Sequence, residues 1–156
     1  MSKFCNMSAI GGSAYGGKKV MVFGTFDLFH LGHENFLKQA NKFGDFLFVV
    51  VARDKTVVKV KKALPKENQK IRLKKVGQNK LVDRAVLGNL GNKYAIIKKI
   101  SPEVICLGYD QKYFVGDLEK ELEKMGLLKT SVKKMNAYHP KKFKSSILKK
   151  KNIRVK

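Results

Sequence analysis

From Lys18 onward, short runs of β-branched and aromatic residues alternate with segments whose apolar residues recur every three or four positions. The runs predict strands, and the periodic segments predict helices. Strands that alternate with helices usually pair in parallel through right-handed crossovers. The sequence therefore predicts an α/β fold with a doubly wound parallel sheet. The predicted strands are residues 19–23, 46–52, 83–87, 104–107 and 131–135, and the predicted helices are residues 33–43, 68–77, 93–100, 118–125 and 145–151.

Three local signals support this assignment. Residues 46–52 are almost continuously apolar, as a strand covered on both faces must be. Ser101 and Pro102 end the helix before them, because a residue that precedes proline avoids the helical conformation. The predicted helix that follows the first strand has a stripe typical of a helix packed on a sheet, formed by His33, Phe36, Leu37, Ala40 and Phe43.

The length of 156 residues suits one compact domain with its own core. Residues 1–17 are rich in Gly and Ser and lack the order of a secretory signal, so we expect a flexible N-terminal extension before a single domain at residues 18–156. No run approaches the roughly 18 apolar residues that a membrane span needs. Cys5 and Cys106 offer neither a disulfide framework nor a metal-ligand spacing, so we expect a cytoplasmic protein.

The chain is strongly basic, with 34 Lys and Arg residues against 12 Asp and Glu residues and a formal net charge of +22. No carboxylate side chain follows Glu123, so residues 124–156 should face polyanions or open solvent. This balance favours a partner that carries phosphate groups, without saying which kind.

The stretch after the first predicted strand, residues 24–33, carries most of the functional evidence. In open α/β sheets the ligand lies beyond the carboxyl ends of the strands, near the point where the strand order reverses. Gly24 allows a close approach of the backbone to a ligand. His30 and His33 stand three apart as the helix begins, so both imidazoles can lie beside its free N–H groups and bind phosphate oxygens. A purely structural or solvated histidine pair is the alternative.

The sequence Gly-Thr-Phe-Asp at residues 24–27, followed by His-Leu-Gly-His at residues 30–33, resembles the GTFD and HxGH signature of the cytidylyltransferase-like nucleotidyltransferases. The resemblance runs from about residue 18 to residue 147. It implies a Rossmann-like fold, with a five-stranded parallel sheet and helices on both faces. Within this superfamily, residues 51–57, 107–111 and 144–146 resemble segments of the archaeal-type FAD synthases.

This resemblance implies an enzyme that transfers AMP from ATP to FMN and releases FAD and pyrophosphate. A divalent cation, most simply Mg²⁺, would bridge the phosphates of the nucleotide. The resemblance is also compatible with a homodimer. The nearest rival is a cytidylyltransferase that acts on glycerol 3-phosphate or a similar phosphorylated alcohol. The closing motif typical of such enzymes is absent here, apart from Ser145 and Ser146.

The resemblance also implies which residues form the site. His30 and His33 would be catalytic, with His33 stabilising the transition state. The implied nucleotide-binding residues are Gly24, Thr25, Phe26, His30, Leu31, Gly32, His33, Asp110, Tyr138, Ser145 and Ser146.

Each of these assignments has a structural alternative. Asp110 could cap a turn, Tyr138 could be a packing residue, and Ser145 could simply cap the last helix. Lys59 and Lys61 follow the second strand and could clamp the acceptor phosphate, although solvated surface charges are the simpler interpretation in a chain so rich in lysine.

A protein of another class, one that binds nucleic acid on the same fold and lacks catalysis, is a further alternative. The basic last fifth of the chain supports it, because neutralising several phosphates gives a strong, salt-dependent affinity. The sequence contains no RNA-binding or DNA-binding motif, so the enzyme is preferred.

Overall fold

The computed structural model of the chain describes residues 17–92, 94–108 and 115–136. Strands and helices alternate along it, with one additional helix after the second strand. In chain order the elements are β1 (Lys19–Gly24), α1 (Leu31–Asn41), β2 (Phe46–Val51), α2 (Asp54–Lys61), α3 (Gln69–Gly77), β3 (Arg84–Leu87), α4 (Ala95–Ile100), β4 (Val104–Leu107), α5 (Val115–Lys124) and β5 (Ser131–Lys134).

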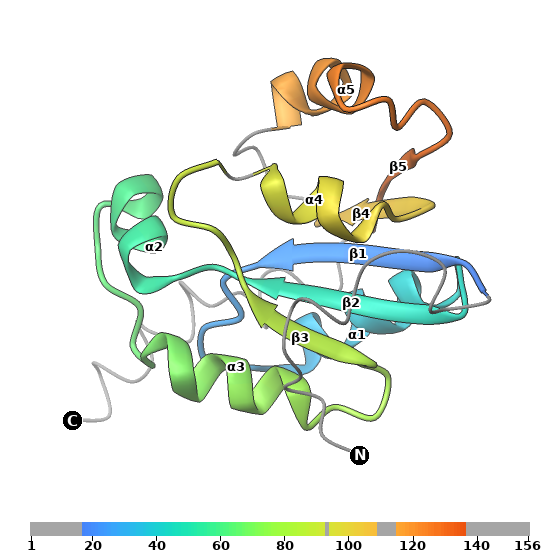
Figure 1. Ribbon diagram of the computed structural model, residues 1–156. Coiled ribbons are helices and arrows are strands. Elements are labelled where there is room, and N and C mark those ends of the chain that lie inside the picture. Colours follow the sequence, from blue (N-terminus) through green and yellow to red (C-terminus); the bar gives the residue numbers. More distant parts are fainter. Residues whose placement is uncertain (1–16, 93, 109–114, 137–156) are drawn as a thin grey trace.

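All five strands pair in parallel, in the order β3-β2-β1-β4-β5 (Figure 1). The chain builds outward from β1 to β3 and then returns to the other side of β1 to place β4. The strand order therefore reverses between β1 and β4, and the carboxyl ends of these two strands flank the switch point. This architecture confirms the predicted doubly wound, Rossmann-like sheet.

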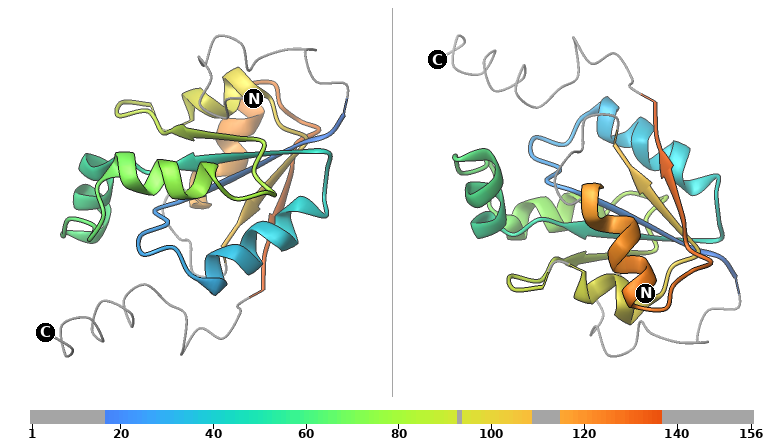
Figure 2. Two further views of the ribbon diagram at one scale, coloured as in Figure 1. Left: turned by 90° about the horizontal axis from the view of Figure 1, so that it is seen from below. Right: turned by 90° about the horizontal axis from the view of Figure 1, so that it is seen from above.

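Each face of the sheet carries its own apolar core, because neighbouring residues of a strand point to opposite faces. In β1, Met21 and Phe23 pack under α4 and α5, whereas Val20 and Val22 pack against α1 and α3. Figure 2 shows α1 on one side of the sheet and α4 and α5 on the other. Helices therefore cover both faces, as the strands' continuous apolar runs require.

Two helix ends follow the sequence signals. Helix α4 stops at Ile100, and Ser101 adopts a left-handed conformation with φ of 51° directly before Pro102. After α5, Gly126 has φ of 75°, a conformation that glycine adopts without steric cost.

Two features of the helices differ from those predicted from the sequence. Helix α2 was not predicted, because it is short and has a single buried residue, Val57, so its apolar period is weak. Phe43 lies beyond the end of α1 and is 37% exposed, which removes it from the predicted stripe. The predicted helix 145–151 and nearly all of the predicted extension, residues 1–16, lie outside the described residues.

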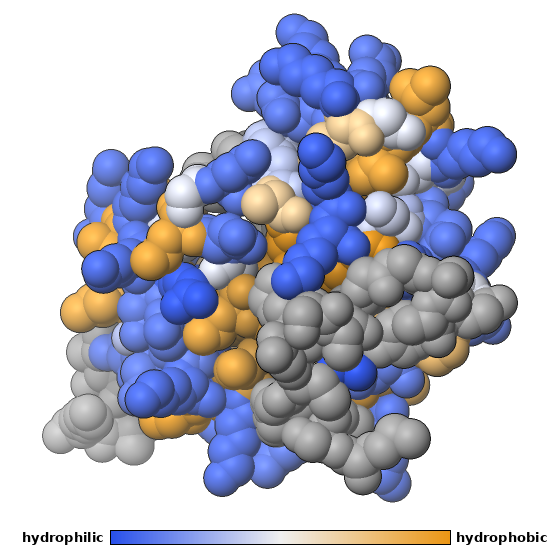
Figure 3. Space-filling view, viewed as in Figure 1, coloured by the Kyte–Doolittle hydropathy of each residue, from blue (hydrophilic) through white to orange (hydrophobic). Residues whose placement is uncertain are grey.

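The outer surface is mainly hydrophilic on the side seen in Figure 3, and apolar side chains gather near α2. Val58 and Val60 of α2 are 40% and 38% exposed, and Leu64 just after the helix is 69% exposed. Across the described part of the chain, no helix combines the length and apolar character required for crossing a membrane.

Candidate active site

The loop between β1 and α1 is held in an uncommon backbone conformation. Phe26 and Leu28 both have positive φ, at 54° and 52°. Non-glycine residues rarely adopt this region, and when they do so at functional sites the surrounding contacts enforce it. Asp27, which is 1% exposed, accepts hydrogen bonds from the backbone N–H groups of Lys66 and Glu67 at 2.8 and 3.0 Å. The carboxylate therefore ties this loop to the segment that leads into α3.

Gly24 makes room for a side chain of the protein. A Cβ at this position would lie 2.7 Å from Cε2 of Phe26, whose ring is 3% exposed. The Phe26 ring therefore fills the space that a side chain at residue 24 would occupy, and the predicted approach of a ligand to the Gly24 backbone stays a prediction. Because the Phe26 side chain is buried, only its backbone could contact a nucleotide.

This packing predicts that Gly24→Ala lowers stability. The added methyl group meets a buried ring, and overpacking of this kind typically costs about 1–3 kcal/mol. Gly91→Ala is the matched control, because a Cβ at Gly91 would meet nothing within 4 Å and the backbone there lies outside the left-handed region. Thermal unfolding of the two variants checks the prediction. Equal melting temperatures would show that Phe26 does not constrain Gly24.

His30 and His33 cap the start of α1 reciprocally. His30 is the N-cap residue, and its Nδ1 accepts a hydrogen bond from the N–H of Gly32 at 3.0 Å. His33 lies in the first turn, and its Nδ1 accepts from the N–H of His30 at 3.3 Å. The two imidazoles thus form a capping box, in which each side chain satisfies a backbone donor at the helix start. The structural and the phosphate-binding interpretations are therefore compatible.

The capping bonds fix the tautomer of both rings. An imidazole nitrogen that accepts a hydrogen bond carries no proton, so in the neutral rings the proton is on Nε2. The rings of His30 and His33 are stacked with centroids 3.8 Å apart and planes 26° apart. The rings of Phe26 and Phe29 each lie 5.4 Å from that of His33, measured between centroids. The result is a paired set of Nε2–H donors held by aromatic packing.

Both imidazoles are neutral at physiological pH. Burial lowers the pKa of His30 below its ordinary value. Burial also lowers the pKa of His33 to about 3; His30, once protonated at low pH, and Lys61 act in the same direction through their charges, and Asp27 opposes them. Neutral imidazoles can still donate hydrogen bonds through Nε2, and the charge of Lys61 lies within electrostatic reach of the pair.

The depressed pKa of His33 predicts a pH-dependent stability. The folded value of about 3 lies below the ordinary value of roughly 6.5, so between these values the unfolded chain binds the extra proton. The free energy of unfolding should therefore fall as the pH drops from about 6.5 toward 3. Urea unfolding at several pH values should show a smaller decline for His33→Asn, in which this titration is removed. Parallel curves for the two proteins would contradict the prediction.

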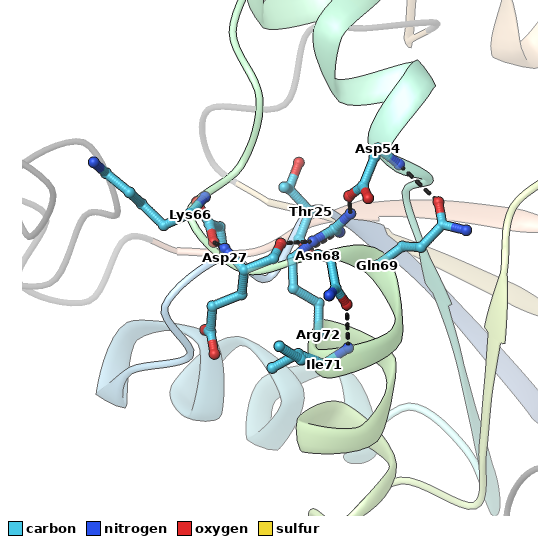
Figure 4. A network of polar contacts seen from close by, with 9 residues as sticks. Thr25, Asp27, Asp54, Lys66, Asn68, Gln69, Ile71 and Arg72 are labelled. Carbon is cyan, nitrogen blue, oxygen red and sulfur yellow. Dashed lines mark hydrogen bonds and ion pairs between the residues drawn. The ribbon is translucent and has the colours of Figure 1, made fainter.

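A buried arginine that was not among the predicted site residues holds the site together. Arg72 of α3 is 0% exposed, and its guanidinium donates to the carbonyl oxygen of Thr25 at 2.7 Å, to that of Glu67 at 3.0 Å and to the Asp54 carboxylate at 2.7 Å. Figure 4 shows the Arg72 side chain reaching between Thr25 and Asp54. The backbone N–H of Asp54 also donates to the Gln69 side chain at 3.0 Å.

One sequence signal could have found Arg72. The chain has 34 basic residues, of which only Arg53, Arg72, Arg84 and Arg154 are arginine. The planar guanidinium makes several hydrogen bonds with fixed geometry, which lysine cannot do. In a chain that otherwise uses lysine, each arginine is a candidate for a position where that geometry is needed.

The remaining predicted residues differ in their burial, and several of them lie outside the described residues. Thr25 is half-buried in the loop, and Leu31, the first residue of α1, is 51% exposed. Lys59 and Lys61 are exposed in the last turn of α2. Of the two, Lys61 is the one that contributes to the lowered pKa of His33. The predicted residues Asp110, Tyr138, Ser145 and Ser146 lie outside the described residues, so their roles stay predictions.

The carboxylates beside the histidine pair are already engaged. Asp27 binds two backbone N–H groups, Asp54 pairs with Arg72, and Glu67 pairs with Lys75. Within the described ranges, no group of three or more His, Cys, Asp or Glu side chains is arranged to hold a metal ion.

Comparison with known proteins identifies the class. The profile of the Cytidylyltransferase-like family matches residues 21–151, which span nearly all of the elements described above. The chain therefore belongs to the cytidylyltransferase-like family of nucleotidyltransferases, as the sequence motifs indicated.

The similar curated proteins include many FAD synthases. The FAD synthase of Aciduliprofundum boonei is 44% identical, over 77% of this chain and 79% of that protein. The FAD synthase of Methanobrevibacter smithii is 42% identical, over 83% of this chain and 86% of that protein. A crystal structure described as the lipopolysaccharide core biosynthesis protein of Thermoplasma volcanium has a TM-score of 0.72 and 37% identity, and covers 78% of this chain and 98% of that one.

Proposed function

We propose that this nucleotidyltransferase is an FMN adenylyltransferase, which makes FAD from ATP and FMN. The observation that carries the proposal is the pair of Nε2–H donors of His30 and His33 at the start of α1, in a chain 44% identical to an FAD synthase. This pair follows β1 at the switch point of the sheet, where ligands of doubly wound folds bind.

The reaction needs positioning and charge stabilisation. An oxygen of the FMN phosphate attacks the α-phosphorus of ATP in line, and a new P–O bond forms. The bond from that phosphorus to the oxygen bridging toward the β-phosphate breaks, and pyrophosphate leaves with the electron pair. No residue of the protein becomes covalently attached. Fixed donors aimed at the oxygens where charge develops are the main requirement for such a transfer.

His30 and His33 meet this requirement. Their Nδ1 atoms are held by backbone N–H groups, so both rings keep their orientation without reorganisation during the reaction. Their Nε2–H groups donate to oxygens of the α- and β-phosphates, with His33 donating in the transition state. The dipole of α1 adds a partial positive charge at the same place.

Other predicted residues complete the proposed site. Among the predicted residues outside the described ranges, Asp110 would address the ribose or base of ATP, and Tyr138 would contact the adenine. Ser145 and Ser146 would bind the β- and γ-phosphates. Within the described residues, Lys61 of α2 would attract the acceptor phosphate, with Lys59 contributing through its charge.

The proposed metal is Mg²⁺, as family membership implies a divalent cation. The Asp27, Asp54 and Glu67 side chains are engaged by the protein itself, so the oxygens of ATP would supply most ligands. When bound, Mg²⁺ neutralises negative charge on the phosphates and so favours attack by an anionic acceptor.

A substrate panel tests the proposal. The purified protein with Mg²⁺ is given ATP with FMN, CTP with glycerol 3-phosphate, and the two exchanged pairs, and pyrophosphate and FAD are measured. We expect FAD and pyrophosphate in equal amounts from ATP with FMN. Turnover of CTP with glycerol 3-phosphate alone would establish the rival cytidylyltransferase. Inertness on every pair, with tight oligonucleotide binding that weakens steeply with salt, would favour a nucleic-acid-binding protein.

A further inference from the structure

A pocket opens beyond the carboxyl ends of β2 and β3, on the side of β1 away from β4. Its volume is about 270 Å³, and it lies where β2 leads into α2 and where β3 leads into the next segment (Figure 1). The residues that line it are Arg53, Leu87, Gly88, Asn89 and Leu90. None of them was a predicted site residue.

The guanidinium of Arg53 is held in this pocket by the backbone. Its Nε–H donates to the carbonyl oxygen of Gly88 at 2.6 Å, and the N–H of Gly88 donates to the carbonyl oxygen of Val51 at 3.0 Å. Arg53 is the N-cap residue of α2 but makes no side-chain capping bond. Its terminal N–H groups have no other hydrogen bond or ion pair with any residue in the described part of the chain. As far as the described residues go, these groups can therefore bind a ligand.

The pocket lies two strands away from the start of the loop that carries the histidine pair. Gly24 is in register with Val51, and Val51 is in register with Leu87, across three adjacent strands. Neighbouring strands are about 4.8 Å apart, so Leu87 of the pocket lies roughly 10 Å from Gly24, where the loop that carries His30 and His33 begins. A ligand of moderate length could therefore occupy both places at once.

The lining favours one kind of molecule. Leu87 and Leu90 supply apolar surface, and Leu90 is an exposed leucine at 55%. The planar guanidinium of Arg53 can stack on an aromatic ring or donate to carbonyl oxygens at its edge, and the amide of Asn89 can donate and accept. A short polyol such as glycerol offers neither a flat face nor an apolar one. A planar aromatic ring with carbonyl groups along one edge fits the whole set.

From this arrangement we infer that the pocket binds the isoalloxazine ring of the acceptor FMN, with Arg53 and Leu90 selecting for it. The inference rests on the proposed function and adds the position of the second substrate. The flavin ring lies beyond β2 and β3, and the ribityl chain leads past α2 to the histidine pair. ATP then approaches from the β4 side, so the two substrates meet at His30 and His33 from opposite directions.

Two variants test the assignment. Arg53→Gln removes the charged planar group, and Leu90→Glu places a carboxylate on an exposed loop residue that no core packing depends on. Lys99→Gln and Leu128→Glu are the matched controls. Lys99 is exposed in the last turn of α4, and Leu128 is 77% exposed between α5 and β5, at the opposite edge of the sheet from the pocket. Thermal unfolding confirms that each variant folds.

Two readouts separate the outcomes. Steady-state kinetics should show that both pocket variants raise the KM for FMN at least about tenfold and leave the KM for ATP within about twofold of wild type. Quenching of FMN fluorescence, measured without ATP, should show the same loss of affinity, and the controls should match the wild type.

The opposite results are equally specific. A wild-type protein that forms FAD, with pocket variants that keep its KM for FMN, overturns the pocket assignment and leaves the proposed function standing. A rise in the KM for ATP alone would place the nucleotide base in this pocket and also overturn it. A wild-type protein that neither forms FAD nor quenches FMN fluorescence overturns the proposed function and the assignment together.

Discussion

Replacing His33 with asparagine should lower kcat for FAD formation by about 10²- to 10³-fold, the usual cost of removing one donor to developing charge. The Oδ1 of asparagine lies close to where Nδ1 of histidine lies, so the variant can still accept the hydrogen bond from the N–H of His30. The variant lacks a donor at the Nε2 position. Catalysis is therefore lost while the cap of α1 is kept, and stability should fall less than in a variant that also loses the capping acceptor.

A second substitution at the same residue separates the two roles. Both substitutions remove the ring that packs against Phe26 and Phe29, but His33→Ala also removes the capping acceptor. We expect the same loss of kcat with an added loss of stability of about 1 kcal/mol or more. If His33→Asn keeps near wild-type kcat while His33→Ala loses it, the role of His33 is structural.

Replacing Arg72 with leucine should have the largest effect on folding. The change leaves the Asp54 carboxylate and the carbonyl oxygens of Thr25 and Glu67 without their partner. Removing one member of a buried pair typically costs about 3–5 kcal/mol, and because the Asp54 side chain is 28% exposed we expect the lower end of this range, which is still a large part of the stability of a domain this size. Urea unfolding measures the loss, and Lys74→Leu, at an exposed lysine of the same helix, is the control.

The conservative variant Arg72→Lys makes the test more specific. Lysine keeps the charge beside Asp54 but has one nitrogen, so it cannot reach the Thr25 and Glu67 carbonyl oxygens together. We expect an intermediate loss of stability and a looser loop between β1 and α1. Stability equal to that of the wild type in both variants would show that the network in Figure 4 does not hold this loop.

The sequence predicted the strands closely because each carries a local signal. The predicted strand 104–107 matches β4, and the other predicted strands differ from the observed ones by a single residue at one end. The ends of α4 and α5 were also predictable, because Pro102 and Gly126 act through the backbone conformation of one or two residues. Helix α2 was missed because one buried valine does not make a period.

The motif of the site could be predicted from the sequence, but the contacts that hold the site in place could not. The histidine spacing indicated a phosphate site, but the reciprocal capping depends on the conformation of residues 25–30, including positive φ at Phe26 and Leu28. Arg72 contacts Thr25, 47 positions earlier in the sequence. Contacts of that kind leave no local pattern in a single sequence, and the pocket at Arg53 is likewise created by the pairing of β2 with β3.

The protonation state of the histidine rings is the most direct test of the proposed phosphate site. Long-range ¹H–¹⁵N NMR spectra of the imidazoles, with His30 and His33 assigned from their asparagine variants, report which nitrogen carries the proton. We expect neutral rings protonated on Nε2 at pH 7, and a shift of both Nε2–H signals when a non-hydrolysable ATP analogue and Mg²⁺ are added. Protons on Nδ1, or Nε2–H signals that do not respond to a bound nucleotide, would contradict the proposed role of the pair.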